Sequence, residues 1–205
     1  NNGKMNAGAD NFAWTDNRFL LQHIFMRPQR SRAETFTAEK WQQDYITVEE
    51  GELGISGFNP SQTGPLYIPK LSLEHLKMTV SRDKHMPLQH GIEKEMPTKL
   101  VSKIGLPFKV DTISISNSTI VYAERPAKTD HWNEMPITDV QGAIFRLGNR
   151  FNGGDSLLVI ASGRVFNGSI QQLVYRESYG DSLSGFTASL HISPLSLPQL
   201  GRQAM

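Results

Sequence analysis

The sequence lacks cysteine, an excess of charge of either sign, and any long apolar run. The absence of cysteine in 205 residues excludes a disulfide framework, a thiolate metal site and a cysteine nucleophile. The 21 basic and 20 acidic side chains give a formal net charge of +1. That balance argues against a nucleic-acid partner, which needs a basic surface. No stretch approaches the roughly 18 apolar residues that cross a bilayer.

Hydrophobic residues make up 38% of the chain, and it contains 17 glycines. This composition lies in the range of globular proteins that bury a core. The first residues, Asn1-Asn2-Gly3-Lys4, include neither a starting Met nor the apolar stretch of a signal peptide. We therefore expect residues 1–205 to be a single β-rich segment of a longer protein, with any membrane anchor outside this segment.

One spacing of apolar residues recurs four times along the chain. Two alternating apolar positions are followed, after a gap of five residues, by two more. The four copies are Phe12, Trp14, Phe19 and Leu21; Ile46, Val48, Leu53 and Ile55; Leu71, Leu73, Met78 and Val80; and Ile113, Ile115, Ile120 and Tyr122. Alternation with a period of two predicts β-strands.

The odd gap inside each copy changes the parity of the alternation, and two structures account for such a change. A β-bulge adds one residue to a strand. A two-residue hairpin instead pairs the two halves of the motif, with Asp16-Asn17, Glu50-Gly51 or Asn117-Ser118 in the turn. The pattern by itself leaves both interpretations open.

The second half of the chain also reads as strands, over residues 137–147, 156–165, 169–175 and 184–192. Asn167-Gly168 predicts a hairpin turn. Residues 97–104 predict one short helix with Pro97 in its first turn and Gly105 after its end, whereas residues 27–33 and 59–65 read as loops. We predict a mainly β fold, a curved and largely antiparallel sheet of half-pipe or sandwich-like form. Sub-units 1–90 and 106–200 would be joined by that helix.

The candidates for chemistry are weak. His85 and His90 flank Met86 but lack the spacing of a metal site, so we interpret them as solvated loop residues. Gly54-Ile55-Ser56-Gly57 only approximates a nucleophile elbow. The carboxylates at 49, 50, 52, 93 and 95 are typical of solvated charges. We predict no catalytic residue, no metal ligand and no cofactor.

Two further features have a simple structural interpretation. Ser81-Arg82-Asp83-Lys84 directly follows the third copy of the motif. It could bind an anion, but we interpret it as charge that keeps an edge strand soluble. Trp132, between His131 and Asn133, is the one candidate for an aromatic ligand platform.

Taken in order, these segments resemble the AsmA-like family of Gram-negative envelope proteins, in particular its Bacteroidetes-type members. The resemblance covers LSLEHLKMTVSRDKHMP and MPTKLVSKIGLPFKVDTISISNSTIVYAERP. In the family, an R-D-K exit (here Arg82-Asp83-Lys84) precedes a short helix and two strands, here at residues 106–117 and 120–124. The later blocks and the ending at residues 193–200 are also similar, although Gly201 follows Leu200 where the family has Asn.

The resemblance implies a non-enzymatic periplasmic protein, anchored in the inner membrane by a segment outside this chain. It implies a half-pipe with an apolar inner face, a role in lipid handling or outer-membrane biogenesis, and phospholipid or acyl chains as partners beside unidentified envelope proteins. We predict that the groove is lined by Ile46, Val48, Leu53, Ile55, Leu71, Leu73, Met78, Val80, Ile113, Ile115, Ile120 and Tyr122.

Two alternatives stay open at this point. The same residues could form the closed core of an ordinary sandwich, whose two sheets cover each other. The chain could also be an extracellular β-sandwich module that binds carbohydrate or protein through its loops.

Overall fold

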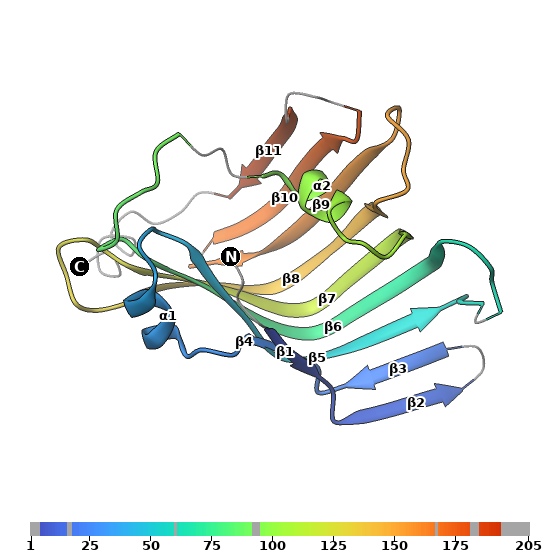
Figure 1. Cartoon of the computed structure of the whole chain (residues 1–205), viewed down its shortest axis with the longest axis horizontal. Coiled ribbons are helices and arrows are strands. Elements are labelled where there is room, and N and C mark those ends of the chain that lie inside the picture. Colours follow the sequence, from blue (N-terminus) through green and yellow to red (C-terminus); the bar gives the residue numbers. More distant parts are fainter. Residues whose placement is uncertain are drawn as a thin grey trace.

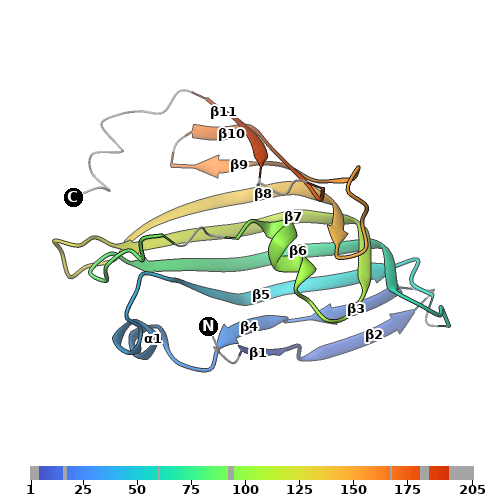
Figure 2. The same ribbon diagram turned by 45° about the horizontal axis from the view of Figure 1, so that its top comes forward.

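The chain forms one curved sheet with two short helices (Figures 1 and 2). The computed structural model describes residues 5–15, 18–59, 61–91, 95–166, 168–180 and 185–193. The strands within these ranges are β1 (Met5–Gly8), β2 (Asn11–Thr15), β3 (Arg18–Gln22), β4 (Phe25–Pro28), β5 (Asp44–Ser56), β6 (Leu66–Asp83), β7 (Phe108–Arg125), β8 (Asn133–Gly148), β9 (Ser156–Val165), β10 (Gly168–Ser178) and β11 (Phe186–Ile192). The predicted mainly β, curved and largely antiparallel sheet is confirmed.

The strands follow one another across the sheet nearly in chain order. The main path runs β1, β4, β5, β6, β7, β8, β9, β10, β11. On one edge of β5, β3 pairs with residues 52–56 and β4 pairs at Val48, so two short strands share that edge. β2 extends the sheet beyond β3, and β1 extends it beyond β4.

One pair, β6 and β7, is parallel and holds its register from Leu66↔Phe108 to Asp83↔Arg125. Parallel neighbours need a crossover connection rather than a tight turn. Residues 84–107 provide it, and they contain the helix α2 (Pro97–Ser102). Figures 1 and 2 show α2 lying over the sheet on the inner side of its curve. Because β6 and β7 pair with each other, the described strands before and after this crossover belong to one sheet.

The sequence analysis predicts one of the two helices and not the other. α2 lies within the predicted range 97–104 and has Pro97 in its first turn. α1 (Arg32–Ala38) is not predicted by the sequence analysis. The loop expected at residues 27–33 is wrong at both ends, because residues 27–28 belong to β4 and residues 32–33 to α1. Ser31 and Glu34 form a capping box at its start. The S-x-x-E spacing of those two residues was the signal for this helix.

The recurring motif has two different structures. The first copy is a hairpin, in which β2 and β3 pair Trp14 with Phe19 and Phe12 with Leu21; its predicted turn, Asp16-Asn17, lies outside the described residues. The other three copies each run through a single strand, β5, β6 or β7. A hairpin turn at Glu50-Gly51 or Asn117-Ser118 is therefore wrong, and the bulge interpretation is right for these copies.

The irregular residues of these strands lie at one level of the sheet, which we call the bulge line. It consists of Gly51 in β5 (φ 152°), His75 in β6 (φ 54°), Asn117 in β7 (φ 49°) and Asp139 in β8 (φ 51°). A residue with positive φ in an extended strand acts as one extra residue. β5 and β6 each carry one such residue at the bulge line. Their pairing therefore has the same register before and after that line: Ile46 pairs with Val80, and Ile55 pairs with Leu71.

β9 shows directly that the bulge line restores the alternation. Val165 and Val159 are six residues apart in β9, so they lie on one face. Val165 pairs with Ile137 of β8, and Val159 pairs with Ile144. Paired residues lie on the same face of a sheet, so Ile137 and Ile144 lie on one face. In a regular strand, residues seven positions apart would lie on opposite faces. The register shift between Thr138 and Gln141 accounts for the extra residue of β8.

The later strands match the sequence analysis closely. β9 has the predicted bounds, and β8, β10 and β11 overlap the predicted ranges. A hairpin joins β9 and β10, but Gly168 pairs with Val165 and so belongs to the strand rather than to the turn. Its predicted turn partner, Asn167, lies outside the described residues.

The sheet is open, because no second sheet packs on it in the described part of the chain. Only seven apolar side chains are buried there: Ile68, Val110, Ile113, Ala123, Val140, Leu157 and Val165. Ile68, Val110 and Ile113 form the centre of the core, with half-buried neighbours from β5 to β8. A two-sheet sandwich core, the first alternative, is thereby excluded for this part of the chain.

Candidate functional site

The inner face of the sheet is identified by the contact that α2 makes with it. Glu177 of β10 is buried, and its carboxylate accepts hydrogen bonds from the backbone N–H and the hydroxyl of Thr98 in α2. The Tyr175 hydroxyl donates to the same carboxylate at 2.9 Å from the same face of β10. Across the strands Tyr175 pairs with Val159, which pairs with Ile144. The face established by β9 is therefore the inner one.

All twelve predicted groove residues lie on this inner face, in four rows across β5, β6 and β7. Two rows lie on each side of the bulge line. The rows are Ile46, Val80 and Tyr122; Val48, Met78 and Ile120; Leu53, Leu73 and Ile115; and Ile55, Leu71 and Ile113. The bulge line is what places both pairs of rows on one face, as the pairing with β9 requires.

The apolar rows continue on both sides of these three strands. Phe19 and Leu21 of β3 extend two rows in one direction, and Ile137 and Ile144 of β8 extend two rows in the other. β8 carries the same spacing as the recurring motif, with Gly142 at one of its four positions. This copy is hard to see in the sequence, because Gly142 has no side chain at one of the four apolar positions.

The inner face is only partly covered. Of the twelve predicted groove residues, Ile46 is exposed, Ile113 is buried and the other ten are half-buried. Ile46 is 37% exposed at one end of the rows, and every residue of β2 and β11 is exposed at the two sides. α2 covers the region around β8 and β10, where Thr98 is its buried residue. Leu100 of α2 and Ile104 just after it are exposed and do not pack on the sheet.

A polar border ends the apolar rows beyond Ile46, Val80 and Tyr122. Arg82 binds Asp44 through two donors at 2.7 and 2.8 Å, and Lys84 lies 2.9 Å from Glu124. The bond from Lys84 lowers the pKa of Glu124. Burial, together with its hydrogen bond to Glu124, raises the pKa of Tyr122. This end of the face therefore changes within one row from apolar to ionic.

The interpretation of Ser81-Arg82-Asp83-Lys84 as charges that protect an edge strand is wrong. β6 is a central strand, and Ser81 and Asp83 are buried rather than solvated at an edge. His85 is not a free loop residue either, since its Nδ1 lies 2.9 Å from Asp83. Arg125 binds Asp83 at 3.1 Å from the other side. Asp83 and Arg125 meet through the parallel register of β6 and β7, which the sequence did not reveal.

The remaining candidates are engaged within the fold. Glu49 faces Lys77 at 3.4 Å and Glu52 accepts from Gln22 at 3.0 Å, so the predicted solvated carboxylates are partly paired. Trp132 is stacked on Phe36, with ring centroids 5.7 Å apart, and the Arg32 guanidinium lies over its ring at 4.1 Å. A platform for a sugar ring is therefore already occupied by protein groups.

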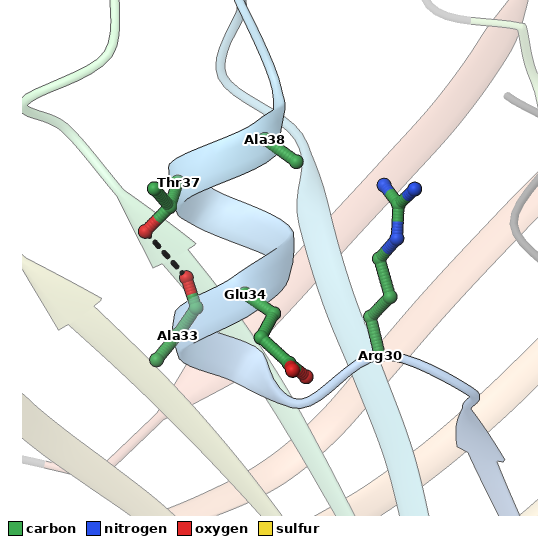
Figure 3. A pocket seen from close by; sticks show the side chains of 5 residues that line it. All are labelled: Arg30, Ala33, Glu34, Thr37 and Ala38. Atoms are coloured by element: carbon green, nitrogen blue, oxygen red, sulfur yellow. Dashed lines mark hydrogen bonds between the residues drawn. The ribbon is translucent and has the colours of Figure 1, made fainter.

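A shallow depression of about 480 Å³ lies beside α1 (Figure 3). Glu34 accepts hydrogen bonds from Ser31, which lower its pKa. Thr37 donates to the carbonyl of Ala33 at 2.9 Å, and Figure 3 shows Arg30 extending alongside the helix. Apart from Arg30, the polar groups here make hydrogen bonds within the helix and its cap.

Comparisons with known proteins add no family. No protein-family model matches the chain, and no curated protein matches its sequence. In the ranges that the structure describes, no helix has the length and apolarity to span a membrane. The same ranges contain no cluster of three or more side chains suited to a metal ion. The functional argument therefore rests on the geometry of the inner face.

Proposed function

We propose that this chain is a non-catalytic, AsmA-like envelope segment that shields the acyl chains of lipids on the inner face of its sheet. The observation that carries the proposal is the set of four apolar rows on one face, with no second sheet over it in the described part of the chain. An apolar face of this size is normally buried or offered to an apolar partner.

The magnitude favours an alkyl chain as that partner. Each methylene removed from water contributes about 0.8 kcal/mol. The rows present apolar side chains from β5 to β7, and their one hydroxyl, on Tyr122, lies in the row next to the polar border. A polar ligand such as a sugar would leave its hydroxyls unpaired on these rows. The polar border at Asp44, Arg82 and Glu124 is suited to remain in water beside a headgroup.

The setting of the proposed activity follows the resemblance to the family. We place the segment in the periplasm, attached to the inner membrane through a part of the protein outside this chain. Its partners would be phospholipids and envelope proteins concerned with lipid transport or outer-membrane assembly. The proposal needs no titrating residue, because moving a lipid breaks no covalent bond.

The test is displacement of a fluorescent fatty acid by phospholipid, with native mass spectrometry of the purified chain. We expect co-purifying lipid and saturable probe binding, both reduced at least tenfold by Ile115→Asp on the inner face. Ser114→Asp introduces the same charge one residue away on the outer face and should leave binding unchanged.

Folding is controlled separately. Ile46→Asp places the charge at a 37% exposed inner-face position and should weaken binding even if Ile115→Asp unfolds the sheet. Equal probe binding by the wild type, Ile46→Asp and Ser114→Asp would overturn the proposal, as would the absence of any lipid together with binding to a glycan array.

A further inference from the structure

The outer face carries a pocket that the lipid proposal does not use. An open pocket of about 550 Å³ lies where β4, β5 and β6 meet the segment that enters α1. Its lining includes two arginines, Arg27 and Arg32, and four hydroxyl side chains, Tyr45, Thr47, Thr79 and Ser81. Thr47 pairs with Thr79 and alternates with Val48 of the inner rows, so these two hydroxyl groups lie on the opposite face, although Val48 also forms part of the pocket lining.

Both arginines are held in place without losing their charge. The Arg32 guanidinium carbon lies 4.1 Å from the centroid of Trp132, and that of Arg27 lies 5.6 Å from the centroid of Phe25. Neither has an ion-pair partner among the described residues. An aromatic ring holds a guanidinium through its face and leaves the N–H donors in its plane for an oxyanion. The pocket is therefore lined by two positioned, unneutralised guanidinium groups.

Ser81 provides an independent observation. The residue is 1% exposed and lines the pocket, and its hydroxyl has no hydrogen-bond partner among the residues that the structure describes. A buried hydroxyl without a partner is unfavourable and is rare in native proteins. An acceptor oxygen that reached this hydroxyl from the pocket would satisfy it. The hydroxyl and the two arginines thus call for the same kind of ligand atom.

The charge and size of the pocket narrow the ligand further. Glu49 also lines it, but this carboxylate faces Lys77 at 3.4 Å, so the two arginines dominate. The volume exceeds that of a bare ion and lies within the usual range for small-molecule sites. Guanidinium forks match phosphate oxygens in pairs. We infer that this pocket binds the phosphate group of a phosphate ester.

The test uses glycerol 3-phosphate as the probe, titrated calorimetrically into the purified chain at low ionic strength. We expect saturable binding with one site per chain, weakened at least tenfold by Arg32→Met and by Arg27→Met. Arg30→Met is the matched control, because Arg30 belongs to the same segment but lines the depression on the other side of α1. Circular dichroism shows whether each variant is folded, and Arg27 is exposed in β4, so its variant is expected to keep the fold.

A second arm uses vesicles of phosphatidylglycerol, with vesicles of phosphatidylcholine as the neutral reference. Binding of glycerol 3-phosphate identifies a soluble ester, whereas arginine-dependent binding of the anionic vesicles alone identifies a lipid headgroup. The inner-face variant Ile46→Asp should leave this binding intact, which separates the result from the proposed lipid groove. Binding to neither probe, or equal binding by Arg30→Met and Arg32→Met, would overturn the inference.

Discussion

At the residue scale, Asp83 is a buried carboxylate that the sequence analysis interprets as an exposed charge. Its side chain is 5% exposed at the end of β6 and lies between His85 and Arg125. Burial alone would raise the pKa of this carboxyl group, but hydrogen bonds from His85 and Arg125 outweigh it, and the pKa is lowered. The ionised form is therefore favoured in the folded chain.

This lowered pKa predicts a stability that depends on acid pH. The contribution of Asp83 is fully present above the pKa of the unfolded chain, about 4, and is lost as the pH falls through the lower folded value. Asp83→Asn should destabilise the chain at pH 7 by about 1–3 kcal/mol and flatten the loss of stability below pH 4. Urea unfolding between pH 2.5 and 7 measures both effects. Asp139→Asn, at an exposed carboxylate, should change neither, and a similar profile for both variants would contradict the prediction.

The contact between Thr98 and Glu177 predicts a second effect at the residue scale. Thr98 is buried and donates from its hydroxyl and its backbone to a buried carboxylate. Thr98→Val should cost about 1–3 kcal/mol, because it removes a donor to a buried charged acceptor.

The measurement is again the free energy of unfolding in urea. Thr37→Val removes a hydroxyl bond of an exposed helix and should stay within about 0.5 kcal/mol of the wild type. An equal effect of the two substitutions would show that α2 is not held to the sheet by Glu177.

At the scale of elements, the bulge line determines which side chains of β5 to β8 lie on the inner face. Each of β5 to β8 carries one residue with positive φ at this level. Without these residues, the five-residue gaps would turn half of the apolar positions toward the outer face. The predicted bulge was one of two interpretations, and strand pairing decided between them, because the pairing depends on residues far apart in the chain.

The bulge predicts an inverted preference for glycine and valine at two nearby positions. His75 has φ 54°, where a β-branched side chain is strained and glycine is not. His75→Gly should therefore be more stable than His75→Val by about 1–2 kcal/mol.

Lys77, two residues further in the same strand, lies outside the bulge line. There the order should reverse, with Lys77→Val more stable than Lys77→Gly by up to about 1 kcal/mol. Thermal unfolding of the four variants measures the double difference. The same order at both positions would contradict the bulge.

At the scale of the whole molecule, the sheet ends in strands that lack the usual protection. β11 contains no charged residue and no proline, and all seven of its residues are exposed. Natural edge strands usually carry such residues to prevent pairing with other chains. The apolar inner positions of β11, such as Leu190, continue the inner face to this edge.

We therefore expect the chain to associate at high concentration through this edge. Ser189→Lys places a charge in β11 on the outer face and should shift the chain toward the monomer without lowering its melting temperature. Sedimentation velocity over a hundredfold range of concentration measures the association. Ser189→Thr keeps the strand uncharged and should associate like the wild type, so equal association of both variants would rule out this edge.

The sequence by itself predicted β2, β3 and β5 to β11, the helix at α2 and the alternation of the twelve apolar positions, but not β1 and β4. These features depend on local alternation and on turn and capping residues, which act over a few neighbours. The spacing in β8 and the capping box of α1 were also present in the sequence but were overlooked. The sequence did not predict that Ser81 and Asp83 are buried or that Arg125 binds Asp83. The sequence of one strand does not show which strands lie beside it.

Only the tertiary structure decided that the sheet is open and that the rows form one face. The parallel pairing of β6 and β7 brings residues more than forty positions apart into register, and the bulge line works only because neighbouring strands carry it at the same level. The outer pocket likewise joins β4, β5, β6 and α1. Local pattern selects the faces of each strand, whereas pairing between distant strands decides which faces join and what they leave exposed.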